Sequence, residues 1–241
     1  MKHFLPSTFL LALLQTIVYA NRFNFDKTIV NGVNAQPGEA PYQVYIWQEV
    51  SPTSWRVCGG TLFKANKVLT AAHCVVPGDG DVYIRYGTQN RSAQLYPDVK
   101  VSKFVNHPNF SQKNLNNDLA VLTLERNILQ DYRVKYAVLR TTDVNVNDRV
   151  TIYGWGRLNG RSSITPNQLQ KQSLTIYQVG PQKIYARGRF SIACQGDSGG
   201  VMISSDGRQS GITSAVQVGC PAGGVNIYTK VSAYINWINE Q

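Results

Sequence analysis

Apolar residues alternate with polar ones in short runs along most of the chain, and each run is bounded by Gly, Pro, Asn or Asp. This period of two is typical of antiparallel strands joined by turns. The clearest runs are Val44 and Ile46, Val82 and Ile84, Val99 and Val101, Ala120 to Leu124, Val150 and Ile152, and Ile212 to Val216. The pattern predicts an all-β protein, either a barrel or a sandwich.

The last residues of the chain follow a different spacing. Val231, Tyr234, Ile235 and Ile238 are separated as i, i+3, i+4 and i+7, which predicts a short amphipathic C-terminal helix. Near the middle, residues 127–133 form a polar crossover between two β-rich halves. A chain of 241 residues accommodates one large β unit or two fused barrels, so length alone leaves the number of domains open.

Residues 1–20 have the pattern of a signal peptide. Lys2 makes the N-terminal region basic, and residues 9–18 are mostly apolar. Val18 and Ala20 then have the small-x-small spacing that precedes a signal-peptide cleavage site. The alternative is a membrane anchor, but the apolar stretch is shorter than the roughly 20 residues needed to span a bilayer. We therefore expect a secreted, extracellular protein without a membrane anchor, in which the sequons at Asn90 and Asn109 are open to glycosylation.

Composition narrows the class of protein further. Hydrophobic residues make up 43% and charged residues 16%, which excludes a disordered chain or a coiled coil. The formal net charge is +10. Because the chain has no basic run, a solvated basic surface, or weak attachment to anionic glycans, is favoured over nucleic-acid binding.

The four cysteines are even in number and all follow the signal peptide. In an oxidising compartment such a set favours two disulfides. Metal binding is the alternative, yet no C-x-x-C pair occurs and only His73 and His107 lie beyond the N-terminal segment. The first-half loop 87–101 contains one acid, Asp98, whereas calcium needs several oxygen ligands. We expect no metal site.

Three segments contain residues suited to nucleophilic catalysis: Thr70–Cys74, Asn116–Leu122 and Cys194–Gly200. A serine hydroxyl reacts only when a positioned base takes its proton, and an imidazole suits that task near neutral pH. A buried carboxylate can fix the imidazole tautomer, and glycines beside the serine let backbone N–H groups face a developing oxyanion. Taken singly, each segment could instead be a turn, a helix cap or a loop.

Together, the order His73, Asp118, Ser198 resembles the trypsin and chymotrypsin family of secreted serine endopeptidases. The resemblance extends over the chain through Ile29–Gly32, Cys58–Leu62, Gly154–Gly156 and Tyr228–Val231. It implies two antiparallel six-stranded β-barrels with the active site between them. The expected divisions are a signal peptide at 1–20, a propeptide at 21–28, and a peptidase domain at 29–241 whose barrels are 29–130 and 131–241.

The resemblance also assigns roles to residues. Ser198 becomes the nucleophile, His73 the general base and acid, and Asp118 the group that orients His73. The N–H groups of Gly196 and Ser198 form the oxyanion hole. Further implied features are Ser214 supporting the aspartate, Leu115 lining an adjoining substrate pocket, and the disulfides Cys58–Cys74 and Cys194–Cys220.

The implied reaction is peptide-bond hydrolysis through an acyl-enzyme, with no cofactor. The implied partners are protein or peptide substrates, an activating protease and protein inhibitors, and nothing in the sequence requires more than a monomer.

Activation in the family frees the amino group that matches Ile29, which then pairs with the carboxylate that matches Asp197. Thr28 precedes Ile29 where Arg or Lys is usual, which predicts an activating protease without tryptic specificity. The threonine junction also resembles mite group 3 allergen-type proteases.

The chain departs from the family at the primary specificity pocket. Ile192 and Ala193 occupy its base, so there is no carboxylate to receive Arg or Lys. Beyond Ser214, which begins the pocket wall, Val216 and Asn226 stand where small residues are usual, and they narrow the mouth. We expect non-tryptic cleavage after small or apolar side chains. The alternative is a catalytically inert homologue that acts as a binding or competitor protein.

Overall fold

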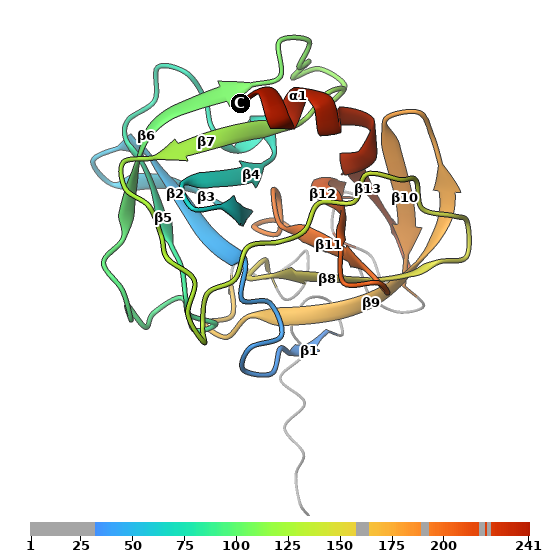
Figure 1. The fold of residues 1–241 in the computed structure, drawn as a ribbon, viewed down its shortest axis with the longest axis horizontal. Helices are drawn as coiled ribbons and strands as arrows, with labels where there is room; N and C mark the ends of the chain where they lie inside the picture. Colours follow the sequence, from blue (N-terminus) through green and yellow to red (C-terminus); the bar gives the residue numbers. More distant parts are fainter. Residues whose placement is uncertain (1–31, 158–163, 189–192, 217–219, 221–222) are drawn as a thin grey trace, which may run out of the picture.

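The computed structural model describes residues 32–157, 164–188, 193–216, 220 and 223–241. The predicted signal peptide and propeptide lie outside these residues. Thirteen strands and one short α-helix are assigned within the described part of the chain (Figure 1). The strands form two closed antiparallel barrels.

The first barrel closes in the strand order β2-β3-β4-β7-β6-β5. The alternating pattern read from the sequence matches its interior, because Val44, Ile46, Val82 and Ile84 are at most 3% exposed. Its strands are β2 (Gln43–Ser51), β3 (Ser54–Lys64), β4 (Lys67–Thr70), β5 (Val82–Arg85), β6 (Val99–Asn106) and β7 (Ala120–Leu124).

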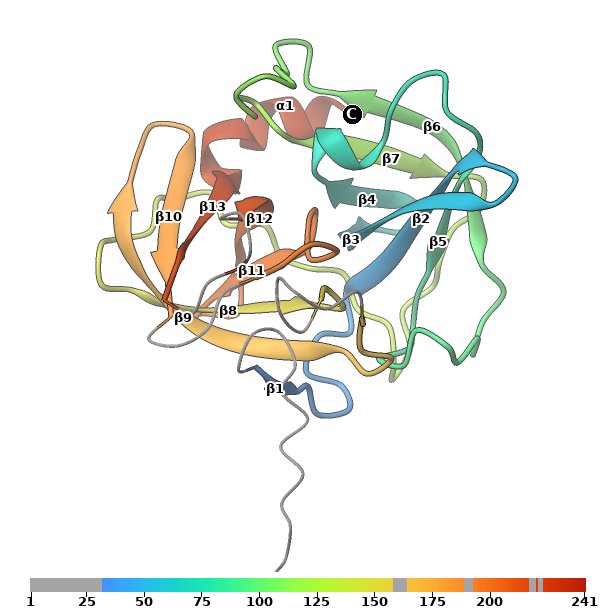
Figure 2. The same ribbon diagram turned by 180° about the vertical axis from the view of Figure 1, so that it is seen from behind.

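The second barrel closes in the order β8-β9-β10-β13-β12-β11, with β11 paired back to β8 (Figure 2). Ile152, Leu174, Ile184 and Tyr228 fill its interior. Its strands are β8 (Arg149–Gly154), β9 (Gln170–Val179), β10 (Lys183–Arg187), β11 (Val201–Ser204), β12 (Gln209–Val216) and β13 (Val225–Lys230). The predicted pair of six-stranded barrels is confirmed.

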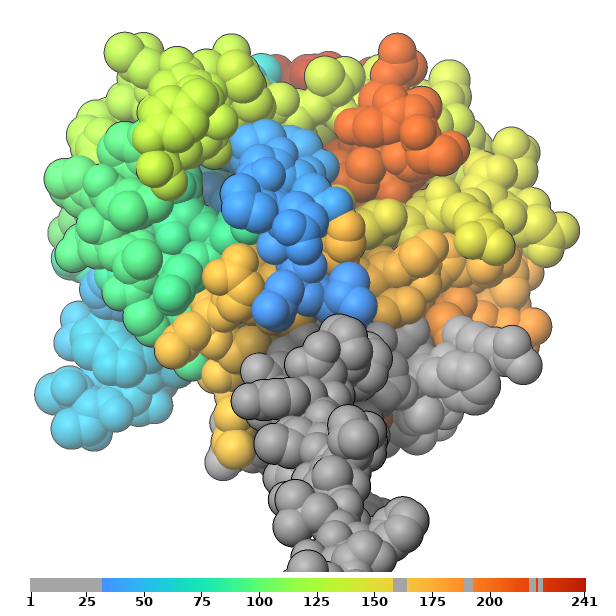
Figure 3. Space-filling view, turned by 90° about the horizontal axis from the view of Figure 1, so that it is seen from below, coloured from blue at the N-terminus to red at the C-terminus, as the bar shows by residue number. Residues whose placement is uncertain are grey.

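The two ends of the described chain each pack on the barrel farther away in sequence. Strand β1 (Val33–Asn34) precedes the first barrel but pairs with β9 of the second, and Figure 3 shows the N-terminal segment in blue between the two barrels. A 3₁₀ turn (Val231–Tyr234) and helix α1 (Ile235–Glu240) follow the second barrel. Their apolar residues Val231, Tyr234 and Ile238 join the core of the first barrel, which confirms the predicted C-terminal helix.

Candidate active site

Strand register brings His73 and Asp118 to the same end of the first barrel. Strands β4 and β7 are antiparallel neighbours, and Thr70, the last residue of β4, pairs with Ala120, the first residue of β7. His73 follows Thr70 by three residues on a 3₁₀ turn (Ala72–Cys74), and Asp118 precedes Ala120 by two. Residues 45 positions apart in sequence are therefore neighbours at one barrel end.

The Asp118 carboxylate is fully buried and accepts three hydrogen bonds. His73 donates from Nδ1 to Oδ2 at 2.8 Å and from its backbone N to Oδ1 at 3.0 Å. Ser214 of β12 donates its hydroxyl to Oδ2 at 2.5 Å. A carboxylate that holds the proton on Nδ1 leaves Nε2 of the imidazole free to accept one, so His73 has the tautomer of a general base.

The second barrel also holds the aspartate through its backbone. Thr229 of β13 donates its side-chain hydroxyl to the Asp118 carbonyl at 2.8 Å. Asp118 therefore belongs to the first barrel by sequence and is fixed by β12 and β13 of the second. The family resemblance assigns Ser214 to the support of the aspartate. It includes Thr229 in the segment Tyr228–Val231 but gives it no role.

Ser198 lies in the loop before β11, and this loop packs against the first barrel. The N–H of Gly59 donates to the Ser198 carbonyl at 2.8 Å. Gly199 has φ +75°, and a Cβ there would lie 2.2 Å from Thr70 Oγ1 and 3.2 Å from Cys74 Sγ. Only glycine permits both this conformation and this approach, so Gly199 brings Ser198 beside the turn that carries His73.

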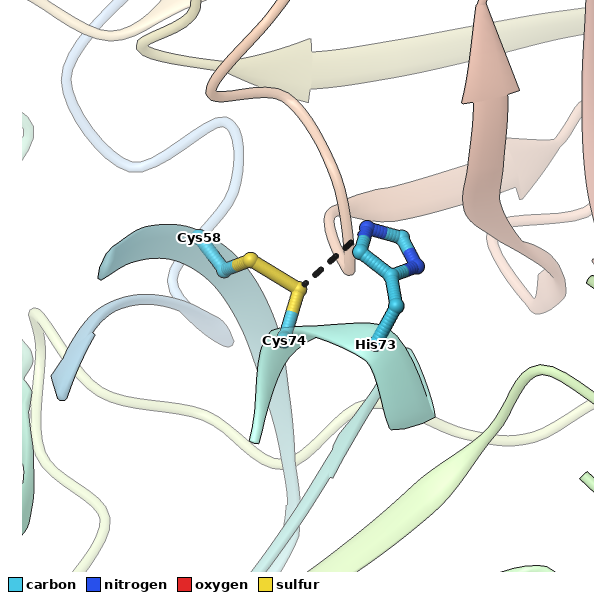
Figure 4. Close-up of side chains that lie close together, drawn as sticks. All are labelled: Cys58, His73 and Cys74. Atoms are coloured by element: carbon cyan, nitrogen blue, oxygen red, sulfur yellow. Dashed lines mark hydrogen bonds between the residues drawn. A yellow bond between two sulfur atoms is a disulfide. The ribbon is translucent and has the colours of Figure 1, made fainter. Parts of the chain in front are cut away.

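The disulfide Cys58–Cys74 joins β3 to the histidine turn, and Figure 4 shows the imidazole next to it. His73 Nε2 lies 3.9 Å from Cys74 Sγ. Because both sulfurs are in the disulfide, the cluster of Cys58, His73 and Cys74 offers no thiolate for a metal ion. Cys194 and Cys220 form the second bond, so both predicted disulfides are confirmed.

The Ser198 hydroxyl is half-buried and donates no hydrogen bond to His73 within the described residues. Such bonds are often long in free enzymes and shorten when substrate binds. The neighbouring backbone has two free donors: within the described chain the N–H groups of Gly196 and Ser198 reach no acceptor, whereas those of Asp197, Gly199 and Gly200 do. Free N–H groups on both sides of Asp197 suit the binding of an anionic oxygen.

Asp197 is buried in a cradle made by two glycines. Its carboxylate accepts hydrogen bonds from the N–H groups of Gly156 at 2.7 Å and Cys194 at 2.8 Å. A Cβ at Gly154 or Gly156 would lie within 2.4 Å of the carboxylate. Burial raises the pKa of Asp197 to about 6, although the two N–H donors lower it. Within the described residues no cation pairs with it, and Ile29 lies outside them.

The described residues of the predicted specificity pocket are two apolar and two polar side chains, Ala193, Val216, Ser214 and Asn226. Val216 of β12 pairs directly with Asn226 of β13 and packs against the disulfide Cys194–Cys220. Ala193 is fully buried nearby. Asn226 is also fully buried, and its Nδ2 donates to the Tyr228 hydroxyl at 3.1 Å while its Oδ1 has no partner. Ile192 lies outside the described residues.

Two other residues singled out from sequence have defined positions. Leu115 lies in the loop before Asp118, with φ +50°, and its N–H donates to the Ser111 carbonyl at 2.8 Å. Asp98 accepts two hydrogen bonds from the Arg85 guanidinium, at 2.9 and 2.7 Å. Its carboxylate is therefore neutralised by arginine.

Two closed β-barrels, with a buried aspartate–histidine pair and a serine in a glycine-rich loop where they meet, define the chymotrypsin-like class of protein.

The family model described as Trypsin matches residues 29–238. Curated relatives include a chymotrypsin of Phaedon cochleariae, which is 33% identical and aligns over 87% of this chain and 80% of the relative. Trypsin Blo t 3 of Blomia tropicalis is 31% identical, and the alignment covers 87% of this chain and 84% of that relative. Mouse neuropsin, a serine protease, superposes with a TM-score of 0.78 at 26% identity, covering 87% of this chain and 97% of its own.

The chain belongs to the trypsin family and is a serine endopeptidase, so its substrates are proteins or peptides. In the part of the chain that the structure describes, no helix is long and apolar enough to cross a membrane.

Replacing Ser214 by alanine is expected to lower kcat about tenfold, since the buried Asp118 carboxylate loses one of its three donors and a hydrogen bond to a charged group contributes about 1.5–3 kcal/mol. The measurement is steady-state hydrolysis of a peptide substrate across pH. Ser210→Ala is the matched control, because Ser210 is buried on the same strand and its hydroxyl contacts only the Met202 carbonyl. Equal kcat values for the two variants would contradict a supporting role for Ser214.

Proposed function

We propose that Ser198, His73 and Asp118 act as a catalytic triad that hydrolyses peptide bonds. Ser198 attacks the scissile carbonyl while His73 Nε2 takes its proton, and the acyl-enzyme then forms as His73 returns that proton to the leaving amine. Asp118 keeps the imidazole in the required tautomer. Water, activated by the same histidine, attacks the acyl-enzyme and restores Ser198. The observation that carries the proposal is the Nδ1–Oδ2 bond of 2.8 Å beside a serine loop seated on the same barrel end.

Gly196 and Ser198 form the oxyanion hole in this proposal. Their N–H groups are free of acceptors within the described chain. The φ of +99° at Gly196 belongs to the region that favours glycine. Donors fixed before the reaction stabilise the negative charge that develops on the substrate oxygen without reorganising at that moment.

The enzyme is made as an exported zymogen with a signal peptide at 1–20 and a propeptide at 21–28. Cleavage after Thr28 frees the amino group of Ile29, which pairs with Asp197. The buried carboxylate supports this step, because an ionised carboxylate that has two N–H donors and, among the described residues, no paired cation is costly to bury. Because Asp197 stands between the two oxyanion donors, the new ion pair orders Gly196 and Ser198. The activator is a protease that accepts threonine.

The preferred substrates have small or apolar side chains at the primary pocket. Val216 lies beside Asn226, its partner on the neighbouring strand, and packs on the disulfide Cys194–Cys220. This packing supports a pocket with little width for a long side chain. The same packing favours a second candidate function, a catalytically inert homologue that binds proteins through this surface. Asn226, with no exposed surface, is the observation in its favour.

Covalent labelling of Ser198 by a fluorophosphonate probe separates the two functions. The protein is processed to begin at Ile29, and Ser198→Ala is the control. The probe is small and demands little of the specificity pocket, so it reports the triad and the oxyanion hole. Labelling that disappears in the control is the expected result. A correctly processed protein that stays unlabelled would exclude the protease function and favour the inert binder.

A further inference from the structure

Three aromatic side chains form a continuous surface on the outside of the first barrel. The ring of Trp47 on β2 stacks on Tyr83 of β5, with centroids 4.4 Å apart, and meets the edge of Trp55 of β3 at 5.0 Å. Strand register explains the contact, because Trp47 pairs with Tyr83 on one side and with Val57 on the other. We call Trp47, Trp55, Val57 and Tyr83 the aromatic wall.

The aromatic wall is open to solvent at its β3 end. Trp55 is 48% exposed and Val57 is 37% exposed. Exposed tryptophan held in place by other rings is preorganised to bind an apolar group, since little side-chain freedom remains to be lost.

Strand β3 turns the same face toward the serine loop. Side chains alternate along a strand, so positions 55, 57 and 59 share one face. A Cβ at Gly60 would meet Ile46 and Val68 inside the barrel, whereas a Cβ at Gly59 would lie 2.9 Å from Gly200 Cα. The outer face of β3 therefore runs without interruption from the serine loop to Trp55.

The distance along this face matches a short stretch of substrate. Gly59 donates to the Ser198 carbonyl at 2.8 Å, and Trp55 lies four strand residues away, or about 13 Å at about 3.3 Å per residue. An extended peptide covers that distance in about four residues. The family resemblance makes Ser214 the start of the strand that pairs with substrate, on the second-barrel side of Ser198. The rest of the substrate then continues on the opposite side, over β3, and we assign the leaving half to that side.

Two ion pairs border the aromatic wall. Arg56 contacts Asp79 at 2.5 Å, and Lys100 contacts Asp81 at 2.7 Å. Glu49, the cross-strand partner of Trp55, makes no ion pair among the described residues, so one acidic group lies beside the wall. The wall itself consists of three aromatic rings and Val57, which suit an apolar partner.

We propose that the aromatic wall binds a large apolar side chain of the substrate, three or four residues after the scissile bond. The inference rests on the proposed protease function and extends it to the leaving half of the substrate. Trp55 acts as a specificity-determining residue, and it takes no part in the chemical step.

The test compares Trp55→Ala with the wild type on two peptides that share one acyl half. One peptide has leucine or phenylalanine at the third and fourth positions after the scissile bond, and the other has glycine there. We expect Trp55→Ala to lower kcat/KM about tenfold for the apolar peptide, mostly through KM, and to leave the glycine peptide unchanged. Trp55→Phe should restore most of the loss, and Tyr132→Ala, an exposed aromatic at 77% elsewhere on the surface, should show none.

A binding measurement keeps this inference distinct from the question of turnover. The same two peptides are titrated into processed Ser198→Ala protein, with and without Trp55→Ala, by isothermal calorimetry. Tighter binding of the apolar peptide that is lost in Trp55→Ala supports the aromatic wall even if the wild type cleaves nothing. Equal affinity for both peptides, or an equal effect of Trp55→Ala on both, would overturn it.

Discussion

Replacing Asp118 by asparagine is expected to reduce kcat of the processed enzyme about 10⁴-fold, the loss that the Ser-His-Asp template gives for this change. The carboxylate accepts from three donors on two oxygens. An amide has only one oxygen, so its NH₂ must face a donor or force His73 to accept at Nδ1. A proton on Nε2 then prevents the imidazole from taking the proton of Ser198.

The measurement for Asp118→Asn is single-turnover hydrolysis of an ester or peptide substrate at pH 8. Asp206→Asn is the control, because Asp206 lies in the exposed turn between β11 and β12 and pairs with Arg140. Circular dichroism confirms that both variants fold. A kcat within tenfold of the wild type would show that Asp118 does not set the tautomer.

Replacing Asp197 by alanine is expected to leave the enzyme inactive even after correct cleavage before Ile29, with kcat/KM lowered at least roughly 10³-fold. Without the carboxylate, neither the N–H groups of Gly156 and Cys194 nor the freed amino group has its acceptor, and the oxyanion donors lose their fixed direction. N-terminal sequencing verifies the cleavage before activity is measured. Full activity of the cleaved variant would exclude the ion pair.

The same carboxylate makes the stability of the unprocessed chain depend on pH. The pKa of Asp197 is about 6 in the folded state against an ordinary 3.8, so the folded chain holds the proton more tightly. Its ionisation therefore removes about 3 kcal/mol of stability as pH rises from about 4 to above 6. Urea unfolding of the unprocessed Ser198→Ala protein between pH 4 and 7 measures this loss. We expect the loss to disappear when Asp197→Asn is added, and an unchanged pH dependence would contradict the assignment.

Much of the fold could be predicted because burial in a barrel is periodic. Val44 and Ile46, like Val82 and Ile84, are spaced two residues apart, and they are the side chains that the structure places inside. The family resemblance supplied what periodicity cannot, namely two six-stranded barrels rather than a sandwich. The pairing of Val33 with Lys171 of β9 had no local signal, because a two-residue strand is too short to show a period.

The candidate site also contains residues that the sequence predicts and contacts that it does not. His73, Asp118 and Ser198 stand in motifs, so their roles could be predicted from order and neighbours. Contacts made by the backbone or by small residues could not: the bond from Gly59 to Ser198 and the fit of Gly199 against Thr70 depend on how two barrels meet. The sequence predicts that Asn226 narrows the pocket, but the bond of Asn226 to Tyr228 and its unpaired Oδ1 follow from burial that the sequence does not reveal.

The exchange of chain ends between the barrels has a mechanical consequence. Strand β1 holds the second barrel from the start of the domain, while the 3₁₀ turn and α1 hold the first barrel from its end. Together with the connection at residues 125–148, three covalent tethers cross between the barrels. If a protease cut the chain in that connection, β1 and the C-terminal turn and helix would still hold the two barrels together. We therefore expect the two barrels, with the histidine turn on the first and Ser214 on the second, to separate only when the whole domain unfolds.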